Sequence, residues 1–378
     1  QLVDTGHVDV MMSIGPKFFY TRSLPCTLWF YDKSKPKERL DGVLMIDARN
    51  VYTVASARSH VFTEEQLSNL SAITWLHRGQ TERFVELLGY YQQQLAEHLQ
   101  QLPERISADN QQISLLGKAL GDLSDATLQA TAVAIARTKL GEENGLTDEL
   151  LTSFRDELKQ VQTQSQVWQE LIDTALASAK SLLDELSAPA NLAGQKIAQG
   201  KAEASNTTLK AGLAALETRH KAWLKLLDMA EKQLRCRQWA SVDYTFDYDN
   251  CREAKKALQH RDVKKREQPT VRDLAVEACK RASYFIAQGH WLLSRFPDGV
   301  YADVPGLCSV VSRATIAAND YSLTPGRYVG AALGVEDDDE GEAFRERMKE
   351  IHGELVELNE TAVGLANLIS QNFEELLG

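Results

Sequence analysis

Two long stripes of apolar residues, separated by a short break, constrain the fold of this chain more than any other feature. Within each stripe the positions advance in alternating steps of three and four residues, the spacing of a long helix that packs against a partner. Pro189 and Gly194 allow a turn between them. An antiparallel helical hairpin is therefore the simplest packing. The stripes consist of Leu151, Phe154, Leu158, Val161, Ser165, Trp168, Ile172, Ala175, Ala179, Leu182 and Leu186, and of Leu209, Leu213, Leu216, His220, Trp223, Leu227, Ala230 and Leu234.

A third stripe of this kind ends the chain. It runs from Phe344 to Leu376 and follows an acidic linker, Glu336 to Glu342. Such a stripe packs either on a helix of another subunit or on its own domain. The positions that would contact a partner are Met348, Ile351, Leu355, Leu358, Leu365 and Ile369.

Composition indicates a soluble, acidic, cytoplasmic protein. The chain has 378 residues, which favours two or three domains, and a net charge of −11. No apolar run approaches the roughly 20 residues that cross a bilayer, and no signal segment is present. The five cysteines form no C-x-x-C pair and are expected to be reduced. No histidines form a metal-type pair, and His220 is interpreted as a residue that sets helix register or lies at an edge.

Near the amino terminus, short apolar runs bounded by Gly, Pro and charged clusters predict strands at Val8–Ile14, Cys26–Tyr31 and Val43–Ile46. Between the first two lies an aromatic loop, Gly15-Pro16-Lys17-Phe18-Phe19-Tyr20. Such a loop could hold a flat, π-faced ligand at a sheet edge. The other interpretation, which the local pattern favours, is an ordinary hairpin whose aromatic rings cap a core. The first residue, Gln1, falls at the lead-in to a strand, so the chain is expected to be part of a longer protein.

Helices follow from Thr63 onward. Thr63-Glu64-Glu65-Gln66 has the pattern of a capping box, and Leu67, Leu70, Ile73 and Leu76 follow at helical spacing. A further helix is expected from about Thr81 to Leu102, where Pro103 would end it. Another helix is expected from about Thr270 to Arg295. The Pro-Gly pairs after it predict an irregular, turn-rich region.

A basic run lies between Arg252 and Arg266. Lysine and arginine release counterions when they neutralise DNA phosphates, so contacts to DNA are one interpretation. A solvated helix face is the other, and it is the favoured one. The candidate phosphate contacts are Lys255, Lys256, Lys264, Lys265 and Arg266.

Two separated stretches resemble one family. The first is the aromatic loop with Leu24-Pro25-Cys26-Thr27-Leu28-Trp29-Phe30 and Val43-Leu44-Met45-Ile46-Asp47-Ala48. The second is Asp320-Tyr321-Ser322-Leu323-Thr324-Pro325-Gly326-Arg327-Tyr328-Val329-Gly330, followed by the terminal stripe. Both are similar to the modification subunit of type I restriction–modification systems, a DNA adenine-N6 methyltransferase of the gamma class. The resemblance covers about residues 1–100 and 270–378, and not the helical region between about 105 and 265.

The resemblance implies a site-specific, adenine-specific DNA methyltransferase that uses S-adenosylmethionine. It implies that the target adenine leaves the duplex and stacks on an aromatic ring. Phe19, of the pair Phe19-Tyr20, resembles the stacking residue of the family, and Phe18 is the competing register. It also implies double-stranded DNA, a specificity subunit, a second modification subunit and a restriction subunit as partners.

The family's catalytic motif, Asn-Pro-Pro followed by Phe or Tyr, is absent from this sequence, as is a strand followed by a glycine-rich cofactor turn. Catalytic and cofactor-binding residues are therefore expected upstream of Gln1, and the chain alone is expected to be inactive. No metal site is predicted. The alternative function is a helical scaffold or interaction protein without catalytic activity, which the long stripes suggest.

Together these patterns predict a mainly α chain with a small α/β part. Residues 1–60 would hold the last strands of a Rossmann-like methyltransferase sheet, and residues 61–295 a helical region with the antiparallel hairpin as an insertion. Residues 296–335 would form the turn-rich segment. Residues 336–378 would form the acidic linker and a C-terminal helix that docks on a partner.

Overall fold

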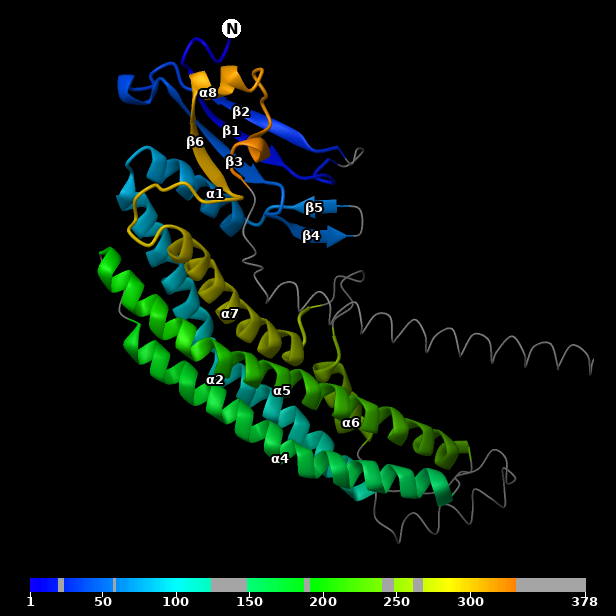
Figure 1. The fold of residues 1–378 in the computed structure, drawn as a ribbon. Helices are drawn as coiled ribbons and strands as arrows, with labels where there is room; N and C mark the ends of the chain where they lie inside the picture. Colours follow the sequence, from blue (N-terminus) through cyan, green and yellow to red (C-terminus); the bar gives the residue numbers. More distant parts are fainter. Residues whose placement is uncertain are drawn as a thin grey trace, which may run out of the picture. The chain divides into compact units, whose positions relative to one another are not determined.

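The structure is a computed structural model that describes residues 1–19, 24–56, 59–123, 148–186, 191–239, 248–260 and 268–330. These residues form two compact units. One contains Gln1–His60 together with the described residues from Asp303 onward, and the other contains Val61–Ala302. The first is built around a small sheet and the second is helical (Figure 1).

The sheet has the strand order β2-β1-β3-β6. β1 and β3 are parallel, with Val10 opposite Leu44 and Ile14 opposite Ala48, whereas β2 and β6 run antiparallel to their neighbours. β1 and β3 are almost wholly buried, which explains why they are continuous apolar runs. The strands are β1 (Val8–Ile14), β2 (Cys26–Tyr31), β3 (Gly42–Ala48) and β6 (Cys308–Ser312), and a separate two-stranded sheet consists of β4 (Thr53–Ser56) and β5 (Ser59–Val61).

The first two predicted strands are confirmed at their predicted residues, and the third is longer by one residue at its start and two at its end. β6 was not expected, because its five residues lie within a region that the Pro-Gly pairs marked as irregular. Its register places Ile46 opposite Cys308 and Gly42 opposite Ser312. In Figure 1 this strand, from late in the chain, lies beside β3.

Residues after β6 cover one face of the sheet. They form helix α8 (Arg313–Ala318) and a short 3₁₀ helix, η3 (Pro325–Arg327). Ile316 and Val329 from this segment are buried in one cluster with Met11, Val43 and Met45, and Leu323 and Tyr328 pack against that cluster. The Tyr328 hydroxyl donates to the Ser322 carbonyl, 2.7 Å away. The segment is therefore part of the hydrophobic core of the sheet unit.

A buried ion cluster closes the amino-terminal edge of the sheet, where β1 and β3 begin. Asp9 is fully buried, and its carboxylate lies 3.1 Å from Arg39, in the 3₁₀ helix η1 (Lys37–Arg39), and 3.7 Å from Lys35. The Lys35 ammonium also donates to the Val8 carbonyl. Burial lowers the pKa of Lys35, and the carboxylate of Asp9 opposes that effect. With this edge filled, the opposite, carboxyl edge is the one that can present loops to a ligand.

The helical unit contains long helices that pack side by side (Figure 1). α2 contacts α1, α4, α5, α6 and α7, and α5 contacts α4 and α7. The core of the helical unit includes Leu116 and Leu120 of α2, Phe154 and Leu158 of α4, and Leu226 and Leu227 of α5. The helices are α1 (Glu64–His77), α2 (Thr81–Leu123), α4 (Asp148–Glu185), α5 (Leu192–Trp239), α6 (Tyr248–Leu258) and α7 (Val271–Arg295).

Side chains cap two helices at the residues that the sequence indicated. Thr63 and Gln66 form the predicted capping box of α1. Thr270 caps α7 in the same way, with Asp273 as its partner. On α1, Leu70, Ile73 and Leu76 are buried as expected, but Leu67 is wrong as a core residue, because its side chain is 49% exposed. It lies in the first turn of the helix, on the solvent side.

The expected end of a helix at Pro103 is wrong. α2 continues through Pro103 to Leu123, although a proline cannot donate the hydrogen bond to the preceding turn. Leu99, Leu102 and Ile106, on either side of the proline, are all nearly fully buried. Their packing stabilises the continuous helix against the local cost of the proline.

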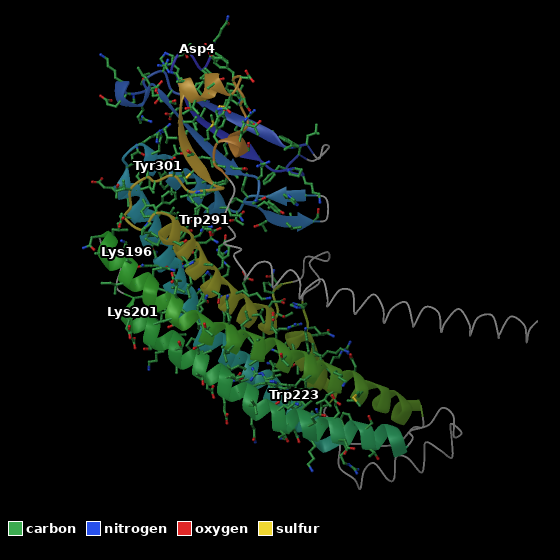
Figure 2. The ribbon with its side chains drawn as sticks, viewed as in Figure 1. Asp4, Lys196, Lys201, Trp223, Trp291 and Tyr301 are labelled. Carbon is green, nitrogen blue, oxygen red and sulfur yellow. The ribbon has the colours of Figure 1, made fainter. Side chains whose placement is uncertain are left out.

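The two stripes of the central region lie on α4 and α5, which pack antiparallel. Glu157 pairs with Lys225 near one end of the two helices, and Glu185 pairs with Lys201 near the other. A side chain at Gly212 would collide with the Cβ of Ala175, so the backbones approach closely between these ends. The indole of Trp223, labelled in Figure 2, donates to Ser165 at 3.1 Å, so the polar position of the first stripe is used inside the packing.

A buried carboxylate joins α2 to α5. Asp109 is fully buried, and its two oxygens lie 2.6 Å from the Arg219 guanidinium and 2.6 Å from His220 Nε2. Arg219 also donates to Gln169 of α4. His220 is therefore an interior residue that fixes the register of two helices, rather than an edge residue. No three His, Cys, Asp or Glu side chains come together as metal ligands within the part of the chain that the structure describes.

The prediction of a mainly helical chain with a small mixed sheet is confirmed for the described residues. That this sheet belongs to a Rossmann-like methyltransferase domain stays a prediction. Among the helices described, none is both long and apolar enough to cross a membrane.

We expect Asp109→Ala to lower the free energy of unfolding of the helical unit by about 3–5 kcal/mol, because it leaves the charge of Arg219 buried without its partner. Urea denaturation followed by far-UV circular dichroism measures this loss. The matched control is Glu157→Ala, which removes an exposed pair with Lys225 and should cost less than about 1 kcal/mol. Equal losses in the two variants would contradict the assignment of Asp109 as the link between α2 and α5.

Candidate functional site

The candidate site lies at the carboxyl edge of the sheet, where the parallel strands β1 and β3 end. Ile14 and Ala48, the last residues of these strands, are paired, so the segments that follow them start side by side. One is the aromatic loop, described from Gly15 to Phe19, and the other runs from Arg49 to Tyr52. Ligands of open α/β sheets bind outside the carboxyl ends of such strands.

The aromatic loop presents one phenylalanine to solvent and packs the other. The ring of Phe19 is 49% exposed. Phe18 is half-buried, and its ring stands edge-on to that of His60, at 6.2 Å and 87° between the ring planes. Tyr20 lies outside the described residues. Of the two competing registers, Phe19 is therefore the more exposed residue.

His60 and Tyr52 are site residues that sequence reasoning missed. Their rings stack at 4.0 Å with 4° between their planes, and the His60 amide donates to the Lys17 carbonyl at 3.0 Å. Tyr52 directly precedes β4 and His60 lies within β5, two strands that were not expected. Thr53 and Val54 are typical strand residues, but nothing in the sequence indicated which ring would stack on His60.

Asp47 and Arg49 form a close ion pair at the same edge. Arg49 Nη2 lies 2.6 Å from Asp47 Oδ2, and its Nε donates to Oδ1 at 2.8 Å. The hydrogen bond and charge of Asp47 raise the pKa of Arg49 further above its usual value. The pair lies against Gly326 of η3, where a Cβ would sit 2.8 Å from Asp47 Oδ2 and would also collide with Arg49.

This arrangement explains why a glycine stands in the Pro325-Gly326-Arg327 turn. Gly306 donates to the Val329 carbonyl, and Asp47 donates to the Leu307 carbonyl, so backbone bonds hold the same segments together. The two stretches that carried the family resemblance thus meet at one edge of one sheet. No local pattern predicts this contact, because the residues are far apart in the chain.

The glycine that follows β1 does not form a cofactor cradle. A Cβ on Gly15 would lie 2.7 Å from the Arg49 carbonyl oxygen, so this position is used for packing between two loops. No other strand in the described part of the chain is followed directly by a glycine. The described residues therefore do not fit the glycine-rich turn that holds a nucleotide-like cofactor.

Two of the other predicted contacts, Lys255 and Lys256, lie on α6 of the helical unit, and Lys255 pairs with Asp228 at 3.4 Å. The remaining candidates fall outside the described residues, both the phosphate contacts Lys264, Lys265 and Arg266 and the docking positions Met348, Ile351, Leu355, Leu358, Leu365 and Ile369. All of these roles stay predictions.

Comparisons with known proteins find similarity in the amino-terminal part of the chain. Residues 1–88 match the family N-6 DNA Methylase. The type I restriction enzyme MjaIX methylase subunit of Methanocaldococcus jannaschii is 32% identical over 90 residues, which are 24% of this chain and 16% of that protein. The chain thus matches less than a fifth of the relative's length. No solved structure shows significant similarity to the chain.

These findings confirm the resemblance to type I modification subunits for the part of the chain that they cover. The matched residues include the aromatic loop, β1 to β5 and the Asp47–Arg49 pair. The family match ends before the segment from Asp320 to Gly330, so the resemblance of that segment stays a prediction.

We expect Gly326→Ala to loosen the segment after β6, because its Cβ would displace Arg49 from Asp47. Overpacking of this kind costs about 1–3 kcal/mol, so exchange of the Gly306 and Asp47 amides should accelerate about ten-fold or more. Hydrogen exchange followed by mass spectrometry measures it. Gly200→Ala on α5 is the control, since a Cβ there meets nothing within 4 Å. Unchanged exchange in Gly326→Ala would show that the pair does not hold the turn.

Proposed function

We propose that this chain is part of the modification subunit of a type I restriction–modification system, an enzyme that transfers a methyl group from S-adenosylmethionine to adenine N6 in DNA. The observation that carries the proposal is the match of residues 1–88 to the N-6 DNA methylase family. The 32% identity to a type I methylase subunit supports the narrower assignment to this type of system.

Phe19 is the residue that we assign to the target adenine. A base inside a duplex is out of reach of an enzyme, so it must leave the stack before methyl transfer. An exposed aromatic ring at the carboxyl edge replaces part of the stacking that the base loses. Stacking of a base on an aromatic side chain is worth about 1–3 kcal/mol. The exposure of Phe19 and the packing of Phe18 on His60 support this choice of register.

The methyl donor is assigned to a part of the protein outside this chain. S-adenosylmethionine supplies an activated methyl group on a positively charged sulfur. The packing at Gly15, among the described residues, and the lack of an Asn-Pro-Pro motif in the sequence support this assignment. We therefore propose that the chain alone does not methylate DNA.

The composition of β2 supports the proposal that the sheet continues in the full subunit. Among the described residues β2 is an outer strand, yet no charged residue, Pro or Gly interrupts Cys26–Tyr31. Leu28 and Phe30, which share one face of the strand, are 39% and 45% exposed. Natural proteins protect outer strands from pairing with charges, prolines or bulges. An unprotected apolar edge is what a strand inside a larger sheet would have, as in a Rossmann-like methyltransferase domain.

Partners follow from the same assignment. We propose that the C-terminal stripe, Phe344 to Leu376, docks on the specificity subunit, which reads the DNA sequence. A second modification subunit and a restriction subunit would complete the complex. The basis for the docking role is the sequence pattern and the family resemblance, since these residues lie outside the described part of the chain.

In the full-length subunit, we expect Phe19→Ala to lower the rate of adenine methylation by about 10- to 100-fold, because the extruded base loses its stacking surface. The affinity for S-adenosylmethionine should stay close to that of the wild type, since Phe19 is assigned to the base and not to the cofactor. Transfer of tritiated methyl groups to DNA and calorimetric titration of the cofactor measure the two quantities.

The control is Tyr90→Ala, which removes an aromatic residue of similar exposure, 45%, in the helical unit. It should change neither quantity. If Phe19→Ala lost methylation and cofactor affinity equally, the variant would be misfolded and Phe19 would not be assigned to the base.

We expect truncation at about Glu336 to abolish co-purification with the specificity subunit, because it removes the whole C-terminal stripe. A finer variant replaces Leu355 and Leu358 with Asp, and its control replaces Glu354 and Glu357 with Ala, which lie off the stripe. The measurement is the amount of each chain that co-purifies with a tagged specificity subunit in affinity purification. Retention of the truncated chain at the level of the intact one would contradict this docking role.

A further inference from the structure

The aromatic loop is tied to the β4–β5 hairpin at two points, and both ties use His60. The His60 amide donates to the Lys17 carbonyl at 3.0 Å, and the His60 ring receives the edge of Phe18 at 6.2 Å. On its other side that ring stacks on Tyr52, at 4.0 Å and nearly parallel. His60 therefore contacts both the loop that carries Phe19 and the ring of Tyr52, which lies between β3 and β4.

The conformation of the loop needs such support. Lys17 has a φ of 69°, in the left-handed region that residues other than glycine adopt rarely. A conformation of this kind persists only where the surroundings hold it. The hydrogen bond from His60 reaches the carbonyl of Lys17 itself, and Phe18, the next residue, contacts the ring. Support is thus applied directly at the strained position.

The Nδ1 atom of the His60 ring is buried and finds no hydrogen-bond partner among the described residues. A histidine acting as an acid or base, or as a hydrogen-bonding spacer, would present its ring nitrogens to a partner. Here the contacts that the structure records are made by the ring's face and by Phe18 at its side, together with the backbone amide. The ring acts as a flat, rigid surface.

We propose that His60 is a positioning residue that fixes Phe18, and through it directs the ring of Phe19 toward the extruded base. Tyr52 supports His60 by stacking on its ring. The inference rests on the proposed function, because it assigns Phe19 to the base. It predicts that an aromatic ring at position 60 is required and that the ring nitrogens are not.

The test uses the full-length subunit in complex with its specificity subunit. The DNA is a duplex that carries the recognition sequence, with 2-aminopurine at the target position, because fluorescence of this base rises when it leaves the stack. Parallel reactions with adenine at that position give the single-turnover rate of methyl transfer. The variants are His60→Ala and His60→Phe, and titration of S-adenosylmethionine reports whether each remains folded.

We expect His60→Ala to lower the methyl-transfer rate about ten-fold or more, since small misplacement of a positioned group is costly. The affinity for S-adenosylmethionine should not change, and the 2-aminopurine signal should change, because Phe19 no longer meets the base in one orientation. His60→Phe should restore most of the rate and the wild-type signal. Should His60→Ala fail to fold, Tyr52→Ala and Tyr52→Phe form a second pair of variants. Tyr52→Ala should lower the methyl-transfer rate by a smaller factor, and Tyr52→Phe should restore it.

Three results would overturn the proposal. The first is a wild-type rate and signal in His60→Ala. The second is a folded His60→Phe as impaired as His60→Ala, which would assign the role to the ring nitrogens. The third is loss of cofactor binding in both alanine variants, which would make the stack a part of the general fold. Failure of the proposed function is distinct, because Phe19→Ala would then leave the rate and the signal unchanged.

Discussion

Backbone pairing of β3 with strands on both of its sides is the interaction on which the sheet unit depends. On one side β3 pairs in parallel with β1, and on the other it pairs antiparallel with β6, from late in the chain. The first pairing sets the aromatic loop beside Asp47 and Arg49. The second brings the Pro325-Gly326-Arg327 turn to the same pair. Without β6, the cluster of Met11, Val43 and Met45 would lose Ile316 and Val329.

The helical unit depends on a different kind of constraint, a single buried charge. Apolar stripes specify that helices lie side by side, but they tolerate a shift of one helix along another. Asp109 binds Arg219 and His220 on α5, and Arg219 reaches Gln169 on α4. Because a charge buried without its partners is costly, only one register satisfies all four side chains. This role of His220 is structural, and the residue lies at the centre of a packed interior.

Sequence patterns predicted elements well where their geometry is local. The strands at Val8–Ile14 and Cys26–Tyr31 and the capping box at Thr63 follow from the order of a few neighbouring residues. Failures occurred where distant contacts override a local preference. Pro103 should end a helix, but buried leucines around it keep α2 continuous. At the candidate site, Phe19 was predicted from its motif, and its role stays a prediction. Tyr52 and His60 were missed because the spacing of residues in a sequence does not show which rings will stack.

By itself the sequence determined the periods of the chain, and hence the strands β1, β2 and β3 and the presence of long helices. It also determined the similarity of its first residues to N-6 DNA methylases. The tertiary structure decided which segments are neighbours. It placed β6 beside β3, packed Phe18 on His60 so that Phe19 stays exposed, and closed the Asp47–Arg49 pair over Gly326. The physical reason for this division is that the spacing of apolar residues shows only which side of its own helix or strand each side chain points to. Partners far along the chain are chosen only when sheet hydrogen bonds and core packing form together.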